Sequence, residues 1–466
     1  MDRGDLVACE DLVMFVNAAV SSTGQRESRS SAAQQRLSLG FLHEYVLGNY
    51  RPLYAAALAL EVNHHNAALI VLNLLREPPS DAAERAAEGA LIARRLRALP
   101  PQRVYALFRA LAKHKVNNRR TRAIVRQWLA GRPDPVFDAV KYRRSLAVAA
   151  RHAHLGLPGE VGAALFTRPG RFATPLLETW RRAHYDTRAV YELPYTVAEG
   201  FAARHKIPRE RFLAGIEPRL TARERERLQG TGARLGVDSV GMDLSRMPLT
   251  RLAVYVLSLP RSVRRARRDE LTAALRAAAR RAAGASAGTW GRVVAVLDDS
   301  YSAAGSAHKR RRPLAVALAT HFLLAELAAD YTGRWLHHRG DPLLVHPIGS
   351  TCLGARLVDA LERRPDRVVV VSDGWDNAPA GLAAEVLRAG RRLAPEVDVV
   401  HLNPVYDDEV FDVRALAPGT PSVGIRDAED AAALVELARF ATGAVPFAEL
   451  RAHLDARVAA YLGQPC

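Results

Sequence analysis

The sequence changes character at residues 284–288, a stretch of small residues, and this change most limits how the chain can fold. Before it, apolar residues recur at three-and-four spacing, which is typical of amphipathic helices. After it come short, continuously apolar runs rich in β-branched residues, which indicate strands buried on both faces of a parallel sheet. These runs are Arg292–Leu297, Arg367–Ser372 and Val397–Leu402. We therefore predict a helical domain over residues 1–285 and a doubly wound α/β domain over residues 286–466.

In the first part, Pro and Gly residues separate short segments that have helical periodicity. These segments are 54–75, 82–96, 103–112, 121–129, 146–155, 221–229, 249–259 and 265–283. Short helices at short spacing, with almost no β-branched runs, predict stacked helix pairs of the HEAT-like solenoid type. Because no clean sequence period is visible, an irregular helical domain is the alternative.

In the second part, segments with helical periodicity alternate with the predicted strands, at residues 312–331, 354–363 and 381–393. Ligands of doubly wound sheets bind at the carboxyl ends of the strands. The residues that directly follow each strand are therefore the candidates for function.

Polar side chains follow two of the predicted strands. Asp298, Ser300 and Ser302 come after the first strand at alternate positions, Asp373 follows the second, and Thr351 precedes a helix between them. Carboxylate and hydroxyl oxygens are the hard ligands that Mg²⁺ prefers. The five residues therefore predict a site for Mg²⁺ or another divalent cation. The structural alternative is that the serines cap a helix and that Asp373 holds a turn.

Charge is divided unevenly along the chain. The 466 residues contain 66 Lys and Arg against 49 Asp and Glu, a formal net charge of +17. Only five of the basic residues are Lys, as a GC-rich genome would produce, but such a bias would spread over the whole chain. Instead, residues 1–285 carry a net charge of +21 and residues 286–466 a net charge of −4. The first part is therefore expected to contact a polyanion, such as nucleic acid or an acidic membrane surface.

Two neighbouring segments, 113–126 and 141–154, hold the densest basic charge of the first part. Lys, Arg, His and Asn together suit contacts with phosphates and base edges, and three of the arginines would share one helical face. The candidate RNA-binding residues are Lys113, Lys115, Arg119, Arg122, Arg126, Lys141, Arg143, Arg144 and His154. A solvated helix face is the alternative interpretation of these segments.

Residues 290–440 resemble a von Willebrand factor A domain with a metal-ion-dependent adhesion site, through the order Asp-x-Ser-x-Ser, Thr, Asp-Gly. The resemblance implies that Asp298, Ser300 and Ser302 contact the metal, and that Thr351 binds it directly or through water. It implies that Asp373 acts from outside the direct ligands, and that an acidic group of a partner completes the octahedron.

The chain departs from that family's pattern in three places. Asp299 lies beside the first ligand, Ser350 replaces a glycine before the threonine, and the stretch between Tyr331 and Ile348 is short. The serine is expected to change the geometry of the loop.

A helical-repeat domain followed by such an A domain resembles the Ro autoantigen family, the TROVE-domain proteins. The local matches span about residues 40–440. MPLTRL at Met247–Leu252, together with the adhesion-site residues, is the most specific part of the resemblance, and the basic segments are the least specific. The other similar segments are Arg122–Trp128, Val140–Tyr142, His205–Leu213 and Gly424–Asp430. The resemblance implies a ring of helical repeats closed by the A domain. Small structured noncoding RNAs would bind its basic outer surface, and single-stranded ends of misfolded RNAs would enter its central hole.

By this resemblance, Lys141, Arg144 and His154 lie nearest to the family's RNA-contacting positions. The match is imperfect, because Ser145 stands where a second basic residue is expected and Leu155-Gly156 replaces Pro-Lys. We expect a non-enzymatic RNA-binding protein of RNA quality control, with a protein partner, a nuclease being one candidate, at the metal site. The alternative is a protein–protein scaffold whose A domain binds an acidic partner through Mg²⁺.

Other protein classes have little support in the sequence. The three cysteines lack metal or redox spacing, and no Walker loop, Ser-His-Asp order or zinc spacing indicates an enzyme. The N-terminal residues do not resemble a signal peptide. The most apolar stretch, 313–329, contains His321 and Glu326, which favours an amphipathic helix over a membrane span. A cytoplasmic monomer without membrane contact is expected.

Overall fold

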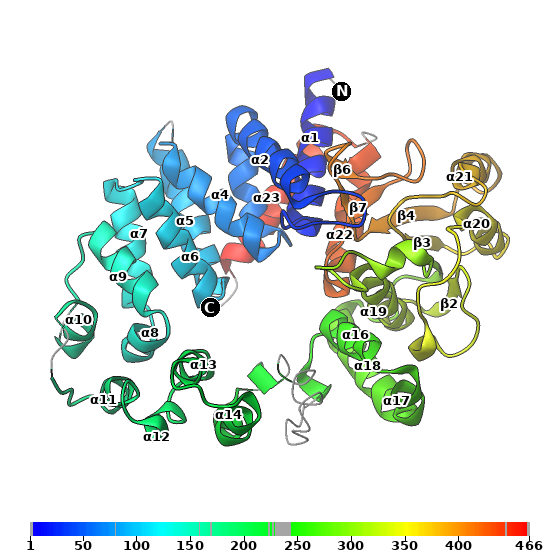
Figure 1. Ribbon diagram of the computed structural model, residues 1–466. Helices are drawn as coiled ribbons and strands as arrows, with labels where there is room; N and C mark the ends of the chain where they lie inside the picture. The colour runs from blue at the N-terminus through cyan, green and yellow to red at the C-terminus, as the bar shows by residue number, and fades with distance from the viewer. Residues whose placement is uncertain are drawn as a thin grey trace. The chain divides into compact units, whose positions relative to one another are not determined.

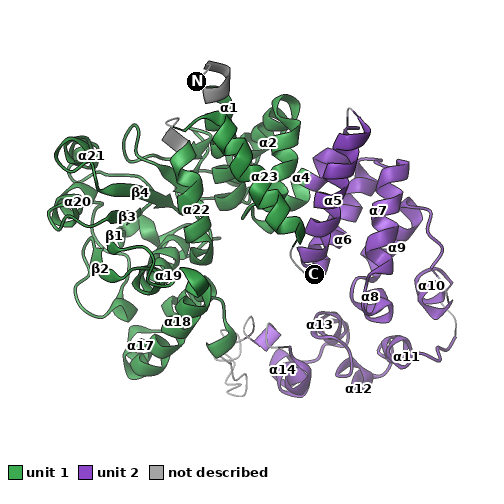
Figure 2. Ribbon diagram, turned by 180° about the vertical axis from the view of Figure 1, so that it is seen from behind, with its two compact units in different colours: residues 1–70, 244–466 green, residues 71–243 purple. Residues whose placement is uncertain are grey.

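The computed structural model describes residues 3–79, 81–157, 159–167, 170–221, 224–225, 228, 244–442 and 445–463. These residues are mostly helical and include a five-stranded parallel sheet (Figure 1). The chain forms two compact units (Figure 2): unit 1 comprises residues 1–70 and 244–466, and unit 2 comprises residues 71–243. The prediction of a helical region followed by an α/β region is confirmed at this level.

The limits of the compact units differ from the predicted boundary at residue 285. Two helices before it, α16 (Leu249–Ser258) and α18 (Arg268–Ala283), pack against α19 (Arg312–Leu327) of the α/β region. The small-residue stretch itself is held in place, since the Gly288 N–H donates to the carbonyl of Glu326 (3.0 Å). Residue 285 therefore marks the change from helices to strands, while the limits of the compact units lie after residues 70 and 243.

The sheet of unit 1 has the strand order β2–β1–β3–β4–β7, and every pairing in it is parallel. Its strands are β1 Arg292–Leu297, β2 Asp330–Trp335, β3 Arg367–Val371, β4 Asp398–Asn403 and β7 Ser422–Gly424. A separate antiparallel pair consists of β5 Tyr406–Asp407 and β6 Asp412–Val413. The predicted strands correspond to β1, β3 and β4, the three central ones.

The sequence missed both edge strands. The helix predicted for residues 312–331 was wrong at its end, because α19 stops at Leu327 and residues 330–335 form β2. Only Trp335 of β2 is fully buried, so this strand lacks the continuous apolar run that identifies the central strands. The other edge strand, β7, has three residues, too few to show a pattern.

Both faces of the sheet are covered, which explains the continuous apolar runs. On one face, Val294 and Val296 of β1 share a core cluster with Leu357 of α20 (Leu353–Leu361) and Leu387 of α21 (Leu382–Leu393). The helix α19 packs against β1, β2 and β3 but contributes no residue to that cluster, so it covers the other face. Because the helices cover the faces of the sheet, the loops at the carboxyl ends of its strands remain available to form a site.

The remaining elements of unit 1 are helical. They are α1 Arg3–Ser21, α2 Ala32–Asn49, α3 Arg51–Ala56, η1 Ala57–Ala59, η3 Leu244–Arg246, α17 Arg261–Ala266, η4 Gly284–Ser286, η5 Tyr301–Ala304, η6 Pro342–Leu344, η7 Ala428–Asp430, α22 Ala431–Ala438, η8 Arg439–Thr442 and α23 Phe447–Gly463. The helix α1 joins the β7 edge, where the Gly424 N–H donates to Asn17 Oδ1 (2.9 Å) and Asn17 Nδ2 donates to Asp412 Oδ1 (2.8 Å). A Cβ at Gly424 would lie 2.6 Å from the Asn17 carbonyl oxygen, so this approach requires glycine.

The helices of unit 2 are short. They are α5 Ala82–Ala98, α6 Pro101–Lys113, α7 Arg119–Ala130, α8 Pro135–Lys141, α9 Arg143–His152, α10 Gly159–Phe166, α11 Pro175–Arg182, α12 Thr187–Val190, α13 Tyr195–Arg204, α14 Arg209–Ile216 and η2 Glu217–Arg219, while α4, His64–Arg76, begins in unit 1. The segment predicted as one helix over 54–75 is broken, because the Asn63 side chain caps α4 by accepting the Asn66 N–H (3.0 Å). The helix predicted over 221–229 lies largely outside the described residues.

Three helices of unit 2 end in the same way. After α6, α9 and α13, a basic residue adopts the left-handed conformation: Lys115 (φ 58°), His154 (φ 53°) and Lys206 (φ 55°). In each case the next N–H bonds back to a carbonyl five residues earlier, which closes the helix end. At two of these helix ends, a histidine contacts the end of another helix. His152 Nε2 lies 2.8 Å from the Val116 carbonyl, and His205 Nε2 lies 2.7 Å from the Ala183 carbonyl.

In unit 1, the segments MPLTRL and GIRDAED contact each other. Thr250, in the first turn of α16, donates its hydroxyl to Glu429 Oε2 (2.6 Å) and its N–H to Glu429 Oε1 (3.2 Å). The Ala428 N–H donates to the Thr250 hydroxyl (2.7 Å). A carboxylate at a helix N-terminus is favourable because N–H groups there lack intrahelical partners. Glu429 therefore caps α16 from a distant part of the chain.

We expect Thr250→Val to lower the free energy of unfolding by about 2 kcal/mol, because it keeps the side-chain shape but removes two buried hydrogen bonds, one to a carboxylate. Urea unfolding followed by circular dichroism measures this change. Thr250→Ser retains the hydroxyl and should stay within about 1 kcal/mol of the wild type. Equal stability of Thr250→Val and the wild type would contradict the capping role.

Candidate functional site

The carboxyl ends of β1 and β3 place two aspartates side by side. Leu297 and Val371 are paired in the parallel register, so the loops that follow them leave the sheet together. Asp298 is buried, and its Oδ1 accepts the Ser300 N–H (2.8 Å) while its Oδ2 accepts the Ser372 hydroxyl (2.9 Å). Asp373, also buried, accepts the Trp375 N–H (3.1 Å).

Three hydroxyls complete this cluster. The Ser300 and Ser302 oxygens are 3.1 Å apart, and Thr351 Oγ1 donates to Ser300 Oγ (3.1 Å). The Ser302 hydroxyl also hydrogen-bonds to Asp373. The structure thus brings together all five residues singled out for a metal site, although they come from three loops.

The two carboxylates are held in an unfavourable environment. Burial, followed by the charge of Asp373, raises the pKa of Asp298 to about 7. Burial also raises the pKa of Asp373, and the charges of Arg29 and Arg414 oppose that rise. A divalent cation between the carboxylates would offset their repulsion, and the hydroxyl oxygens would supply further hard ligands. No group of three or more His, Cys, Asp or Glu side chains is arranged to hold a metal in the described part of the chain.

Asp299, which departs from the family pattern, organises the loop beside the cluster. Its carboxylate accepts the N–H groups of His337 (2.9 Å) and His338 (2.8 Å), and its carbonyl accepts the Ile348 N–H (2.8 Å). Asn377 similarly holds the third loop, since its Oδ1 accepts the Thr351 N–H (3.0 Å). Sequence reasoning missed both supporting roles, because each partner lies more than twenty residues away.

A cavity of about 370 Å³ adjoins the cluster at Asp373. Trp375 lines it and is covered by two guanidinium groups, that of Arg29 at 4.0 Å and that of Arg414 at 3.7 Å from a ring centroid. The other lining residues include Glu27, Asp407, Asp408 and Glu409. An approaching ligand would therefore meet more acidic than basic side chains there.

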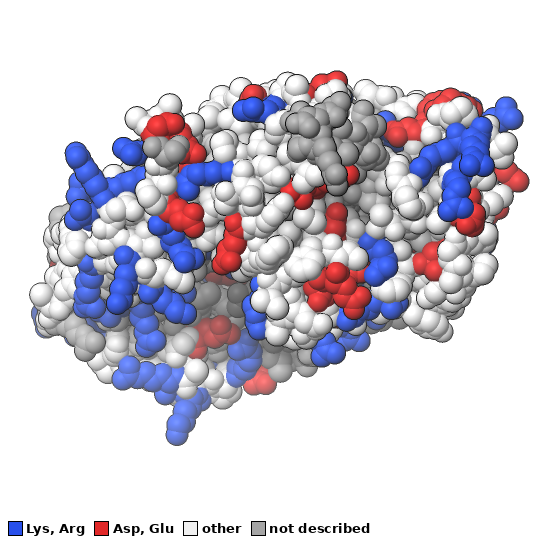
Figure 3. Space-filling view, turned by 90° about the horizontal axis from the view of Figure 1, so that it is seen from above, with Lys and Arg blue, Asp and Glu red and all other residues white. Residues whose placement is uncertain are grey.

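In unit 2, the two basic sequence segments meet at the ends of α6 and α9. Asn117 Nδ2 lies 3.1 Å from His154 Nε2, and the bond from His152 to the Val116 carbonyl joins the same two helix ends. Lys113, Lys115 and His154 are exposed at this junction. Lys and Arg side chains gather over unit 2, at the left of Figure 3.

The other candidate RNA-binding residues divide into exposed and engaged side chains. Arg119, Arg126 and Arg144 are exposed, and Arg122 is half-buried. Lys141 lies 3.8 Å from Glu224 and over the ring of Phe137, while Arg143 donates to the Ala164 carbonyl and stacks over Trp180 at 4.6 Å. His154 and Lys141 flank the two ends of α9, so the structure does not bring them together.

We define the junction patch as Lys113, Lys115, Arg119, Arg151 and His154. Its two lysines and two arginines form no ion pair within the described part of the chain. Sequence reasoning did not select Arg151, which is exposed, and it also missed Lys206. The signal for Lys206 was the repeated dipeptide His-Lys before Val116 and before Ile207.

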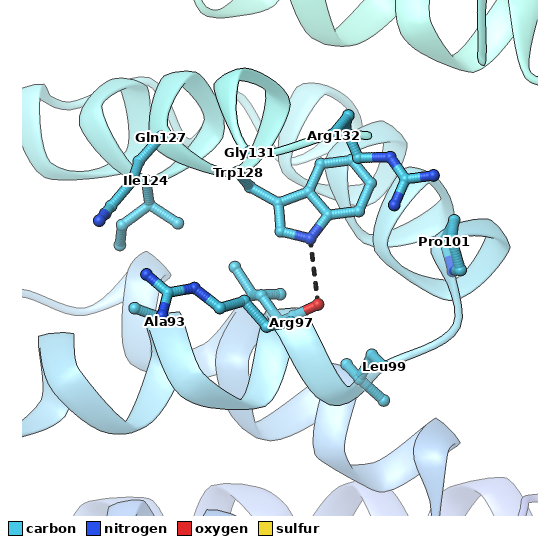
Figure 4. A pocket seen from close by; sticks show the side chains of 10 residues that line it. Ala93, Arg97, Leu99, Pro101, Ile124, Gln127, Trp128, Gly131 and Arg132 are labelled. Atoms are coloured by element: carbon cyan, nitrogen blue, oxygen red, sulfur yellow. Dashed lines mark hydrogen bonds between the residues drawn. The ribbon is translucent and has the colours of Figure 1, made fainter. Parts of the chain in front are cut away.

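A pocket of about 220 Å³ lies between α5 and α7 of unit 2 (Figure 4). Two of its polar side chains already have partners: Trp128 Nε1 donates to the Leu96 carbonyl (3.0 Å), and Arg132 forms two hydrogen bonds to Asp138 (2.6 and 3.1 Å). Ala93 and Ile124 contribute apolar walls. We therefore assign this pocket to the packing of neighbouring helices.

No known protein-family model matches the chain, and no curated protein matches it. Among the described helices, none is both long and apolar enough to cross a membrane. The site is therefore interpreted from its own geometry and charge.

Between pH 4 and pH 7, the wild type should lose stability as pH rises, because Asp298 keeps its proton in the folded protein, where its pKa is raised to about 7, while the unfolded chain releases it. We expect Asp298→Asn to remove this component, so that its thermal midpoint exceeds that of the wild type at pH 8 but not at pH 4. Thermal unfolding in a metal chelator measures both profiles. Asn suits the site, because the Ser372 hydroxyl can rotate to accept a hydrogen bond from the amide N–H of the new side chain.

Asp299→Asn is the matched control. It should lower the thermal midpoint at every pH, because the carboxylate of Asp299 accepts two backbone N–H groups and an amide has one acceptor oxygen. Parallel pH profiles for Asp298→Asn and the wild type would rule out the repulsion between the buried carboxylates.

Proposed function

We propose that this protein binds RNA through unit 2. Residues 71–243 contain 32 Lys and Arg against 17 Asp and Glu, a net charge of +15. The rest of the chain carries only +2. Such a concentration of positive charge is typical of domains that neutralise phosphates.

The junction patch carries this proposal. Two segments separated by more than twenty residues are joined at the ends of α6 and α9, and their exposed cations lack ion-pair partners within the described residues. Cations at helix C-termini are also favourable to the helices themselves, which accounts for one basic residue at an end. Five basic side chains gathered around one junction exceed that need and suit a phosphate backbone.

The proposal extends to the type of RNA-binding protein. The resemblance to the Ro or TROVE family would make unit 2 part of a HEAT-like repeat domain, and the sheet region a von Willebrand factor A domain. The repeated helix ends of α6, α9 and α13 support the repeat, and the contact between Thr250 and Glu429 supports the two family-like segments. Structured noncoding RNA, or the single-stranded ends of misfolded RNA, is the proposed ligand.

Replacing both patch lysines tests this function. We expect Lys113→Gln/Lys115→Asn to weaken RNA binding about tenfold and to reduce the slope of log K against log salt by about 1.5, because two phosphate contacts are lost. Asn is chosen at 115 because it tolerates the left-handed conformation. Fluorescence anisotropy with a labelled structured RNA at several salt concentrations measures both quantities.

Arg363→Gln/Arg392→Gln, which removes two exposed cations of unit 1, is the control of equal charge and should leave the affinity nearly unchanged. Lys141→Gln should have a smaller effect than either patch lysine, because Lys141 already faces Glu224. If the patch variant bound RNA as tightly as the wild type, the patch would not be the RNA surface.

A second function is favoured by the cluster at Asp298 and Asp373. We propose that it binds Mg²⁺ and presents the cation to an acidic group of a protein partner, so that the protein also acts as a scaffold. Two buried carboxylates with raised pKa values and three linked hydroxyls support metal binding. The cation would supply charge for the partner's group, while Asp298, Ser300, Ser302 and Thr351 would hold it.

At pH 8, Mg²⁺ at a hundredfold excess over its dissociation constant should stabilise the wild type by about 2.7 kcal/mol. Ser300→Ala/Thr351→Val should abolish this gain, because it removes two of the oxygen ligands. Thermal unfolding with and without Mg²⁺ provides the measurement.

Ser258→Ala/Thr289→Val is the matched control, because it makes the same two changes at exposed positions outside the metal-site loops. It should keep the full gain from Mg²⁺. An equal Mg²⁺ response in the wild type and in both variants would exclude this metal site.

A further inference from the structure

Five consecutive basic residues, His308–Arg312, interrupt the acidic part of the sequence. They follow the metal-site loop and lead into α19. The RNA-binding proposal does not use them, since they belong to unit 1. Their concentration in a region of net negative charge requires its own explanation.

The run opens onto a cavity of about 270 Å³ within unit 1. Lys309, Arg310, Arg312 and Arg426 line it, and His308 contributes an imidazole. Small polar groups also line it, from Ser21, Thr23 and Gln25. The Ser21 and Thr23 hydroxyls already donate to the Asn17 carbonyl (2.6 Å) and to Gln25 Oε1 (3.3 Å). The cavity thus combines several cations with the Gln25 amide, which can donate hydrogen bonds.

Carboxylates at this cavity pair with some of its cations but not with all of them. Lys309 forms an ion pair with Glu27, and Asp427 serves both Arg312 (2.6 Å) and Arg426 (3.8 Å). Arg310 is exposed and forms no ion pair within the described residues. Three of the four permanent cations are therefore engaged by carboxylates, while Arg310 has no carboxylate partner among the described residues.

The paired cations are also fixed in position. Lys309 is further held by the Ser306 hydroxyl, which accepts its N–H (3.1 Å) and donates to the Arg26 carbonyl (2.7 Å). Arg312 donates to the Arg426 carbonyl (2.5 Å) as well as to Asp427. A ligand would therefore meet a prearranged wall with one free guanidinium, which lowers the entropy cost of binding.

The start of α19 adds to the positive potential. Arg311 occupies its N-cap without a side-chain cap, and the first turn contains no acidic residue. Because the N-terminus of a helix carries a partial positive charge, basic residues there are unfavourable unless an anion is nearby. Asp427 already contacts Arg312 at this helix start (2.6 Å), and a bound anion would add negative charge beside Arg310, which has no ion pair among the described residues.

We propose that this cavity, which we call the 308–312 cavity, binds a phosphate group. Arginine forks match phosphate oxygens through paired charged hydrogen bonds, and Arg310 is the side chain free to make them. The cavity is larger than a phosphate ion, so it also accommodates part of the molecule that carries the phosphate. That molecule is either a small phosphorylated compound or the phosphorylated end of an RNA.

Inorganic phosphate is the first probe, added to the full-length protein and compared with chloride at equal ionic strength. Thermal unfolding should show that phosphate raises the midpoint of the wild type more than chloride does. Arg310→Ala should weaken phosphate binding about tenfold, because a charged hydrogen-bond donor is lost, and Arg310→Lys should retain part of it. Arg392→Ala, another exposed arginine of unit 1, should bind phosphate as the wild type does.

Phosphate binding that equals chloride binding, or an Arg310→Ala protein that responds as the wild type does, would overturn the proposal. The same comparison in the Lys113→Gln/Lys115→Asn background separates this site from the junction patch. The dependence on Arg310 should persist there, whether or not that background still binds RNA.

Two short RNAs that differ only in a 5′-phosphate distinguish the sources of the phosphate group. If the phosphorylated RNA binds the wild type more tightly and Arg310→Ala removes the difference, an RNA end occupies the cavity. If inorganic phosphate binds but the two RNAs have equal affinities, a small phosphorylated compound is the ligand. In both cases the Arg310-dependent phosphate response supports the site.

Discussion

The parallel pairing of β1 and β3 is the constraint on which the candidate metal site depends. It forces Asp298 and Asp373 to the same edge of the sheet, where burial raises both pKa values and the charge of Asp373 further raises that of Asp298. The surrounding loops are arranged around this pair: Ser372 bonds to Asp298, and Asp299 and Asn377 secure the neighbouring loops. The fold therefore maintains a charge repulsion that a cation would relieve, which is a common arrangement at functional sites.

The positive charge of the chain has two separate structural settings. Most of it belongs to unit 2, where exposed cations meet at the ends of α6 and α9 while Lys141 and Arg143 are engaged by neighbouring groups. A smaller concentration surrounds the 308–312 cavity of unit 1, where carboxylates neutralise only part of it. An extended surface suits a polymer of phosphates, whereas a small open cavity suits a single phosphate group.

Several polar contacts of this protein are made at the ends of its helices. The left-handed residues Lys115, His154 and Lys206 close three helices and present basic side chains at the same time. At the start of α16 the charge is of the opposite sign: the Glu429 carboxylate, from a distant segment, accepts a hydrogen bond from a backbone N–H that has no partner within the helix. Both arrangements follow from the unsatisfied backbone groups at helix termini.

The sequence by itself determined the helical first part, the three central strands and the five residues of the candidate metal site. These features depend on local patterns: helical periodicity, buried β-branched runs and polar residues placed directly after a strand. The sequence patterns did not predict the edge strand β2, because this strand is only partly buried. They did not predict the break at Asn63, because its cap depends on a single side chain.

Only the tertiary structure decided which distant residues meet. Periodicity reports the neighbours of a residue along the chain, but it contains no information on contacts between separate segments. The supporting role of Asp299, the capping of α16 by Glu429 and the contact between Asn117 and His154 are therefore visible only in the folded chain. The same holds for Arg310, whose surroundings combine segments from four regions of the sequence because packing, and not spacing, brings them together.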